Sequence, residues 1–168
     1  SYFESGVSDI QGTNFNNQPT QLFSAKNSYL MFSFGSEVLK DFFIGGNIKA
    51  LYSSIDNYSS TGFGTDIGFI YEISENVSSA IMIENIFSSN LWKNQDQSSG
   101  GLSGVLPQIN SLGLRWNIND NIKIHSLIEN MSPNGISIYR FKNGVEWNLL
   151  NYSLRLGLIQ NSGQFSNQ

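Results

Sequence analysis

The sequence contains no cysteine and few charged residues, and both absences narrow the class of protein. Without cysteine there are no disulfides and no thiolate ligands for a metal ion. Charged residues make up only 13% of the 168 residues, whereas an ordinary soluble domain carries about 25%. The formal net charge is −4, so the basic surface that nucleic-acid binding requires is missing.

Long apolar runs are absent as well. No stretch approaches the roughly 18 to 20 apolar residues of a transmembrane helix, and the segment that starts at Ser1 does not have the pattern of a signal sequence. We therefore expect that any export signal has already been removed. The composition is that of a β-protein with many turns, because it combines 16 glycines and abundant Asn and Ser with 13% aromatic residues.

Apolar side chains recur at every second position, which is the period of a β-strand. In residues 63–73, Phe63 and Phe69 would share one face, and Asp66 and Glu72 the other. Within 136–149 the apolar parity shifts near Asn143, which predicts a β-bulge. The alternation predicts about eight antiparallel strands, at 29–35, 42–53, 63–73, 77–87, 110–118, 121–130, 136–149 and 152–159.

The connections between these segments are of two kinds. Short polar turns are expected at 74–76 and 119–121, and long loops near 54–61 and 88–106. Short turns at one end and long loops at the other are typical of outer-membrane barrels. We therefore treat residues 1–168 as a single β-barrel domain.

The residues between the apolar positions indicate which face is wet. A soluble barrel needs a richly charged outer face, whereas here the second face is mostly Gly, Ser and Asn with isolated charges of both signs. Such a face suits the lumen of a membrane barrel, and aromatic residues near the strand ends suit interfacial girdles. The predicted lumen-lining residues are Lys49, Asp66, Glu72, Glu84, Arg115, Lys123, His125, Glu129, Glu146 and Arg155. Alternation alone leaves open a soluble ligand-binding β-barrel or β-sandwich.

The sequence offers no catalytic or metal-binding constellation. His125 is the only histidine, and no cluster of further ligands accompanies it. Asp66 and Glu72 would lie roughly 20 Å apart along one strand, too far for a paired acid and base, so we expect Asp66 to pair with Lys49 instead. No nucleophile elbow precedes a helix. We expect no enzyme, no cofactor and no metal, and an outer-membrane lipase is disfavoured.

Several motifs occur in the order found in the PorV/PorQ-like outer-membrane proteins, which are relatives of the FadL-type barrels. The segments IGGNIKAL at 44–51 and GFGTDIGFIY at 62–71 resemble the middle of that family. Glu84-Asn85-Ile86, the strand at 107–116, GVEW at 144–147 and LRLG at 154–157 follow in order, so the resemblance spans most of 28–160.

The resemblance implies a transmembrane barrel of about fourteen strands in the bacterial outer membrane. It also implies transport of a hydrophobic small molecule, or a part in type IX secretion-like export with a secretion-system protein as partner, and contact with outer-membrane lipid. Because about eight strands are predicted against about fourteen implied, we expect the chain to be a fragment of a larger barrel. The alternative is a complete eight-stranded barrel whose side chains fill its interior.

Overall fold

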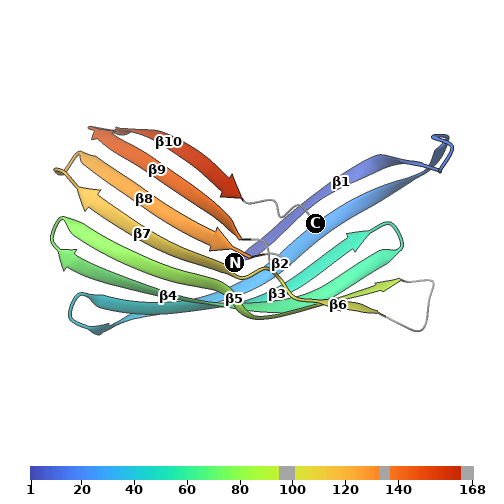
Figure 1. Cartoon of the computed structure of the whole chain (residues 1–168), viewed down its shortest axis with the longest axis horizontal. Helices are drawn as coiled ribbons and strands as arrows, with labels where there is room; N and C mark the ends of the chain where they lie inside the picture. Colours follow the sequence, from blue (N-terminus) through green and yellow to red (C-terminus); the bar gives the residue numbers. More distant parts are fainter. Residues whose placement is uncertain (95–100, 133–136, 164–168) are drawn as a thin grey trace. The chain divides into compact units, whose positions relative to one another are not determined.

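The computed structural model describes residues 1–94, 101–132 and 137–163. Its strands form one ten-stranded sheet in the order β1-β2-β3-β4-β5-β7-β8-β9-β10, with β6 paired to β5 (Figure 1). The described residues contain no helix long and apolar enough to cross a membrane. The predicted all-β antiparallel fold is confirmed. The strands are β1 (Tyr2–Thr13), β2 (Pro19–Leu39), β3 (Phe42–Ile55), β4 (Tyr58–Ser74), β5 (Val77–Asn94), β6 (Leu102–Gly104), β7 (Ile109–Asn117), β8 (Ile122–Met131), β9 (Ile138–Leu149) and β10 (Tyr152–Gly163).

The chain divides into two compact units, each built from parts of several strands. Unit 1 consists of Ser1–Ser33, Asn47–Thr65 and Phe87–Leu106. Unit 2 consists of Phe34–Gly46, Asp66–Ile86 and Pro107–Gln168. Strands β7 to β10 belong wholly to unit 2, where they follow one another as antiparallel hairpins.

The N-terminal hairpin of β1 and β2 was not predicted from the sequence. The pairing of β1 with β2 shifts register between Val7 and Ile10, and Asp9 in this interval has a φ of 57°. A bulge of this kind moves later side chains to the other face, so the period of two is lost in the sequence. Asn14 stabilises the hairpin turn, because its Oδ1 accepts hydrogen bonds from the backbone N–H groups of Asn16 and Gln18 at 2.9 and 3.0 Å.

The two long loops that the sequence predicts are largely replaced by strand. At 54–61, β3 ends at Ile55 and β4 begins at Tyr58, which leaves a tight hairpin turn. Residues 88–94 continue β5, and β6 pairs with this extension; residues 95–100 lie outside the described residues. The serines and asparagines that resembled loop sequence bond across strands instead, as the Ser60 hydroxyl does with the Asn90 side chain.

The bulge predicted near Asn143 is wrong. Strand β9 pairs with β8 and with β10 without any shift of register. Asn143 lies directly opposite Ser126, and the Ser126 hydroxyl donates a hydrogen bond to Asn143 Oδ1 at 2.8 Å. Asn143 therefore lies on the same face as its apolar neighbours, where Ser126 satisfies its side chain. Ile138 lies on the other face, opposite Met131.

Burial is inverted relative to a soluble β-protein. The described residues include no buried apolar side chain, whereas Ser60, Asp66, Ser78 and Ser111 are buried. In β4, Asp66 is 7% exposed and Phe63 is 50% exposed. Along β9 the two faces alternate without exception, and the face with Tyr139 and Trp147 is the exposed one. Large apolar side chains of the described strands are thus exposed, contrary to the usual distribution in soluble domains.

The Ser126–Asn143 pair gives a test of the register. We expect Ser126→Ala to lower the free energy of unfolding by about 1 kcal/mol, because Asn143 loses its partner among apolar side chains. The double variant Ser126→Ala/Asn143→Val should be nearly neutral, since both polar groups are then removed. Urea unfolding of the purified protein measures both, with Ser79→Ala as the control. Equal loss in the single and double variants would contradict the pairing.

Candidate functional site

One face of unit 2 collects the polar side chains, and the strand register defines it. Residues directly opposite each other in antiparallel strands project to the same face. In β5 and β7 to β10, one row of such residues marks the side of the sheet that we call the polar face. We call the opposite side the apolar face. The row consists of Ser78, Arg115, His125, Gly144 and Gly157, one from each strand.

All charged side chains within strands β7 to β10 lie on the polar face. The sequence predicted six of these ionisable residues, and the register places every one of them there. Two further cations, Arg140 and Lys142, were missed because the supposed bulge in β9 obscured their parity. The complete set is Arg115, Lys123, His125, Glu129, Arg140, Lys142, Glu146 and Arg155.

Most of these charges form two ion-pair clusters. Glu129 accepts contacts from Arg140 at 3.3 Å and from Lys142 at 2.5 Å. Glu146 contacts Arg155 at 2.7 Å and Lys123 at 3.9 Å. Each glutamate is therefore shared by two cations. The strands β7 to β10 carry five Lys and Arg residues against two Glu on this face, so its local charge is positive although the chain as a whole is acidic.

Arg115 and His125 lie outside the two ion-pair clusters. They lie opposite each other in the register, and both are exposed. Among the described residues, Arg115 forms no ion pair with a carboxylate. A hollow of about 290 Å³ lies beside them, and its other lining residues are Ser78, Ala80, Gly113, Leu114, Ser126 and Leu127.

Asp66 fixes an irregular position of the neighbouring strand. Its Oδ1 accepts a hydrogen bond from the backbone N–H of Asn85 at 3.0 Å. Asn85 has a left-handed backbone with a φ of 57°, and its side chain donates to the Pro107 carbonyl at 3.0 Å. The Asp66 carboxylate therefore satisfies a backbone donor of β5. The predicted pairing of Asp66 with Lys49 stays a prediction.

The remaining predicted site residues lie apart from these clusters. Lys49 is half-buried in the part of β3 that belongs to unit 1, and Glu72 is exposed near the end of β4. Glu84 lies in β5, on the polar face, directly opposite Ile109. The described residues hold no group of three or more His, Cys, Asp or Glu side chains that could bind a metal ion.

A second, apolar hollow of about 360 Å³ lies over strands β2 to β5 within unit 2. Phe42 and Phe69 stack on one face of β3 and β4, with ring centroids 6.1 Å apart, so Gly45 and Gly68 belong to the other face. Gly68 and Ala80 leave space at the base of this hollow. Its lining residues are Gly35, Ser36, Phe43, Ile44, Gly45, Gly68, Phe69, Ile70, Ala80, Ile81 and Met82.

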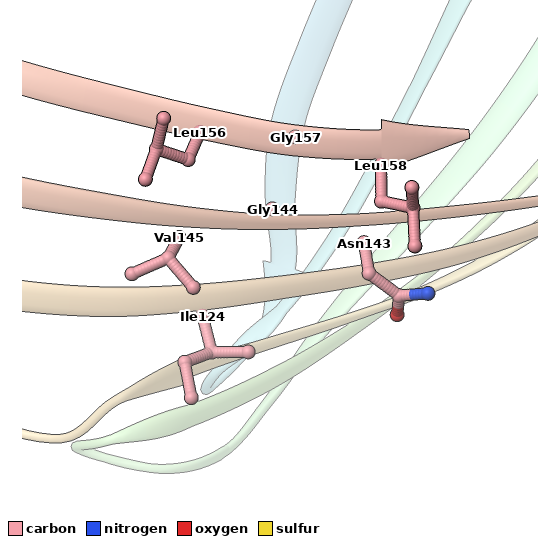
Figure 2. Close-up of a pocket in the computed structure, with 7 residues that line it drawn as sticks. All are labelled: Ile124, Asn143, Gly144, Val145, Leu156, Gly157 and Leu158. Atoms are coloured by element: carbon pink, nitrogen blue, oxygen red, sulfur yellow. The ribbon is translucent and has the colours of Figure 1, made fainter.

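A third hollow, of about 320 Å³, is built around the apolar face of β8, β9 and β10. Figure 2 shows Leu156 and Leu158 of β10 beside Val145 and Asn143 of β9, with Ile124 of β8 below them. Gly144 and Gly157 complete the lining, and no ionisable side chain takes part. This hollow offers only apolar contact and one amide.

The comparisons with known proteins bear on the fold. No protein-family model and no curated protein matches the sequence. The structure is similar to the toluene transporter TodX of Pseudomonas putida, with a TM-score of 0.71 and 12% sequence identity over 96% of this chain and 63% of that one. It is also similar to a TodX deltaS2S3 mutant, a monoaromatic hydrocarbon channel, with a TM-score of 0.66 and 12% identity over 99% of this chain and 63% of that one.

The chain thus spans 63% of the length of both solved structures that it matches. At 12% identity the likeness shows the fold alone. The resemblance to PorV/PorQ-like proteins has no counterpart in these two matches. The antiparallel sheet of ten strands resembles part of the FadL-type barrel of TodX.

Proposed function

We propose that this chain belongs to an outer-membrane β-barrel that transports a hydrophobic small molecule. The inverted burial carries the proposal: large apolar side chains are exposed while serines and Asp66 are buried. An exposed apolar surface of this extent is stable against lipid and not against water. A soluble barrel or sandwich would instead bury the face that contains Leu112, Leu114 and Leu156.

The dimensions of β7 to β10 support a membrane position. These strands have 9 to 12 residues, and about 9 to 11 tilted residues span a bilayer. On the apolar face, Trp147 lies near one end of β9 and Tyr139 near the other. Trp116 and Tyr152 also lie near strand ends. Aromatic residues at both borders of an apolar band are the pattern of interfacial girdles.

The polar face would then line the lumen, together with the predicted residues of β3 and β4. The apolar hollow over β2 to β5 lies on this side, bordered by Phe43, Ile70 and Met82. A largely apolar pocket of a few hundred cubic ångströms is the usual site for a small hydrophobic ligand. The likeness to a toluene transporter agrees with a ligand of this class.

A second candidate function is a part in protein export. The order of the motifs from 44–51 to 154–157, which resembles the PorV/PorQ-like proteins, supports it. In that case the barrel would bind a secretion-system protein instead of passing a small molecule. Transport assays with a hydrocarbon separate the two candidates.

The direction of the two faces can be tested at neighbouring positions of β10. Leu156 lies on the apolar face and Arg155 on the polar face. Leu156→Arg should lower the free energy of unfolding in lipid vesicles by about 2 to 4 kcal/mol if the residue lies near the bilayer midplane. Arg155→Gln removes only an exposed ion pair with Glu146, so it should cost less than about 1 kcal/mol. The reverse order of the two effects would place the lumen on the other side.

The apolar hollow can be filled without a backbone clash. A Cβ at Gly68 would have the Ile81 carbonyl oxygen as its nearest neighbour, at 3.7 Å. We expect Gly68→Leu to reduce toluene uptake into vesicles that contain the full-length protein at least about fivefold, because the side chain occupies the pocket. Gly157→Leu is the matched control, since its Cβ would also meet only a carbonyl oxygen at 3.7 Å, outside this hollow.

The hollow would be excluded as the route if Gly68→Leu left toluene uptake unchanged. It would also be excluded if Gly157→Leu reduced uptake as much as Gly68→Leu does. A protein that folds into vesicles but takes up no toluene in its unmodified form would favour the export candidate.

A further inference from the structure

Arg115 stands out among the cations of β7 to β10 because the other four share two glutamates. It forms no ion pair within the described part of the chain, and it faces His125 directly across the strand pair. We propose that Arg115, His125 and Ser78 bind the oxyanion of a small solute. This inference names a chemical class of ligand for the proposed transport function and therefore rests on it.

The local geometry leaves room for such a group. Ser78, Arg115 and His125 are consecutive members of one row, so neighbouring Cβ atoms are about 5 Å apart. The row continues in Gly144 and Gly157, which have no side chains to cover His125. Gly113 and Ala80, one row away, also line the hollow of about 290 Å³. Arg115 and His125 therefore lie beside open space that small residues frame.

The three side chains supply complementary donors. A guanidinium presents paired N–H groups that match the two oxygens of a carboxylate or phosphate. An imidazole donates at least one N–H in either protonation state, and a serine hydroxyl can donate as well. Ser78 is 7% exposed, so its hydroxyl is largely shielded from bulk water. The surplus of cations on the polar face adds a field that attracts anions.

The neighbouring hollow specifies the rest of the ligand. Ala80 lines both the hollow beside Arg115 and the apolar hollow bordered by Phe43, Ile70 and Met82. A solute with a small apolar group attached to an oxyanion can therefore contact both at once. Arylacetates and aryl phosphates have this form, and both present the oxyanion that the proposed site recognises.

The test compares charged and neutral ligands of one shape. Isothermal titration calorimetry of the full-length protein in detergent micelles measures the dissociation constants of phenylacetate, phenyl phosphate and neutral phenylacetamide. We expect phenylacetate or phenyl phosphate to bind more tightly than phenylacetamide. Arg115→Gln should weaken binding of the anions about tenfold or more, because hydrogen bonds to a charged group are lost, and change phenylacetamide binding less than about twofold.

Arg140→Gln is the matched control, because it removes the same charge from the same face at a cation that Glu129 already pairs. Equal loss of anion affinity in Arg115→Gln and Arg140→Gln would overturn the proposal, since the general field of the face would then explain the binding. Equal affinity of the unmodified protein for phenylacetate and phenylacetamide would also overturn it. Arg115→Lys, which keeps the charge and loses the paired donors, should bind the anions with intermediate affinity.

The same titrations distinguish a carboxylate from a phosphate as the preferred oxyanion. The preferred group is that of the anion with the lower dissociation constant, phenylacetate or phenyl phosphate. Failure of the proposed function has a different signature. If vesicles with the unmodified protein take up no toluene, toluene transport is excluded and the export candidate is favoured, while the anion affinities and their dependence on Arg115 still decide whether the oxyanion site exists.

Discussion

The continuous antiparallel ladder is the constraint on which the other features of unit 2 depend. From β5 to β10 through β7, β8 and β9, the pairing runs without a register shift. Backbone donors and acceptors that point toward a neighbouring strand in such a ladder have partners there, so they do not need water on either face of the sheet. Strict register also keeps residues that lie opposite each other in successive strands on the same face of the sheet. This pairing explains three features of unit 2: the separation into a polar and an apolar face, the two ion-pair clusters around Glu129 and Glu146, and the row that contains Arg115.

The period of two made much of this predictable from the sequence. In β7 and β10 the alternation is uninterrupted, and Arg115 and Arg155 lie on the face that it predicts. Prediction failed where local chemistry interrupts the period. The bulge around Asp9 hides β1, and Asn143 resembles a break although Ser126 satisfies its side chain. The supposed break in β9 concealed Arg140 and Lys142, which are half of the cations that bind the two glutamates.

The hollows were beyond sequence reasoning for a different reason. Each is formed by side chains from several strands, and their neighbourhood depends on the register between strands that are distant in sequence. Ser78, Arg115 and His125 come from three strands and become neighbours only through two pairings. The glycines of the apolar hollow carried an ambiguous signal, since a glycine in a strand marks a bend, a bulge or a close approach. Only their neighbours show that Gly68 leaves open space, whereas Gly45 marks a close approach, since a Cβ there would lie 3.0 Å from the Phe34 carbonyl oxygen.

A lumen that passes hydrophobic molecules must combine two opposite properties. The face of the sheet that forms its wall has to be polar, so that it faces water and not lipid. The same wall also needs apolar surface where a ligand can leave water. In the proposed lumen, strands β2 to β5 would provide the second property through glycine and alanine next to Phe43 and Met82. Strands β7 to β10 would provide the first, through a face on which Lys142 pairs with Glu129 and Arg155 with Glu146. The two glutamates pair with four of the five Lys and Arg residues of β7 to β10, whereas Arg115 has no carboxylate partner in the described part of the chain. Arg115 and Ala80 line the same hollow, and Ala80 also lines the apolar hollow, so the proposed oxyanion site and the apolar surface meet at Ala80.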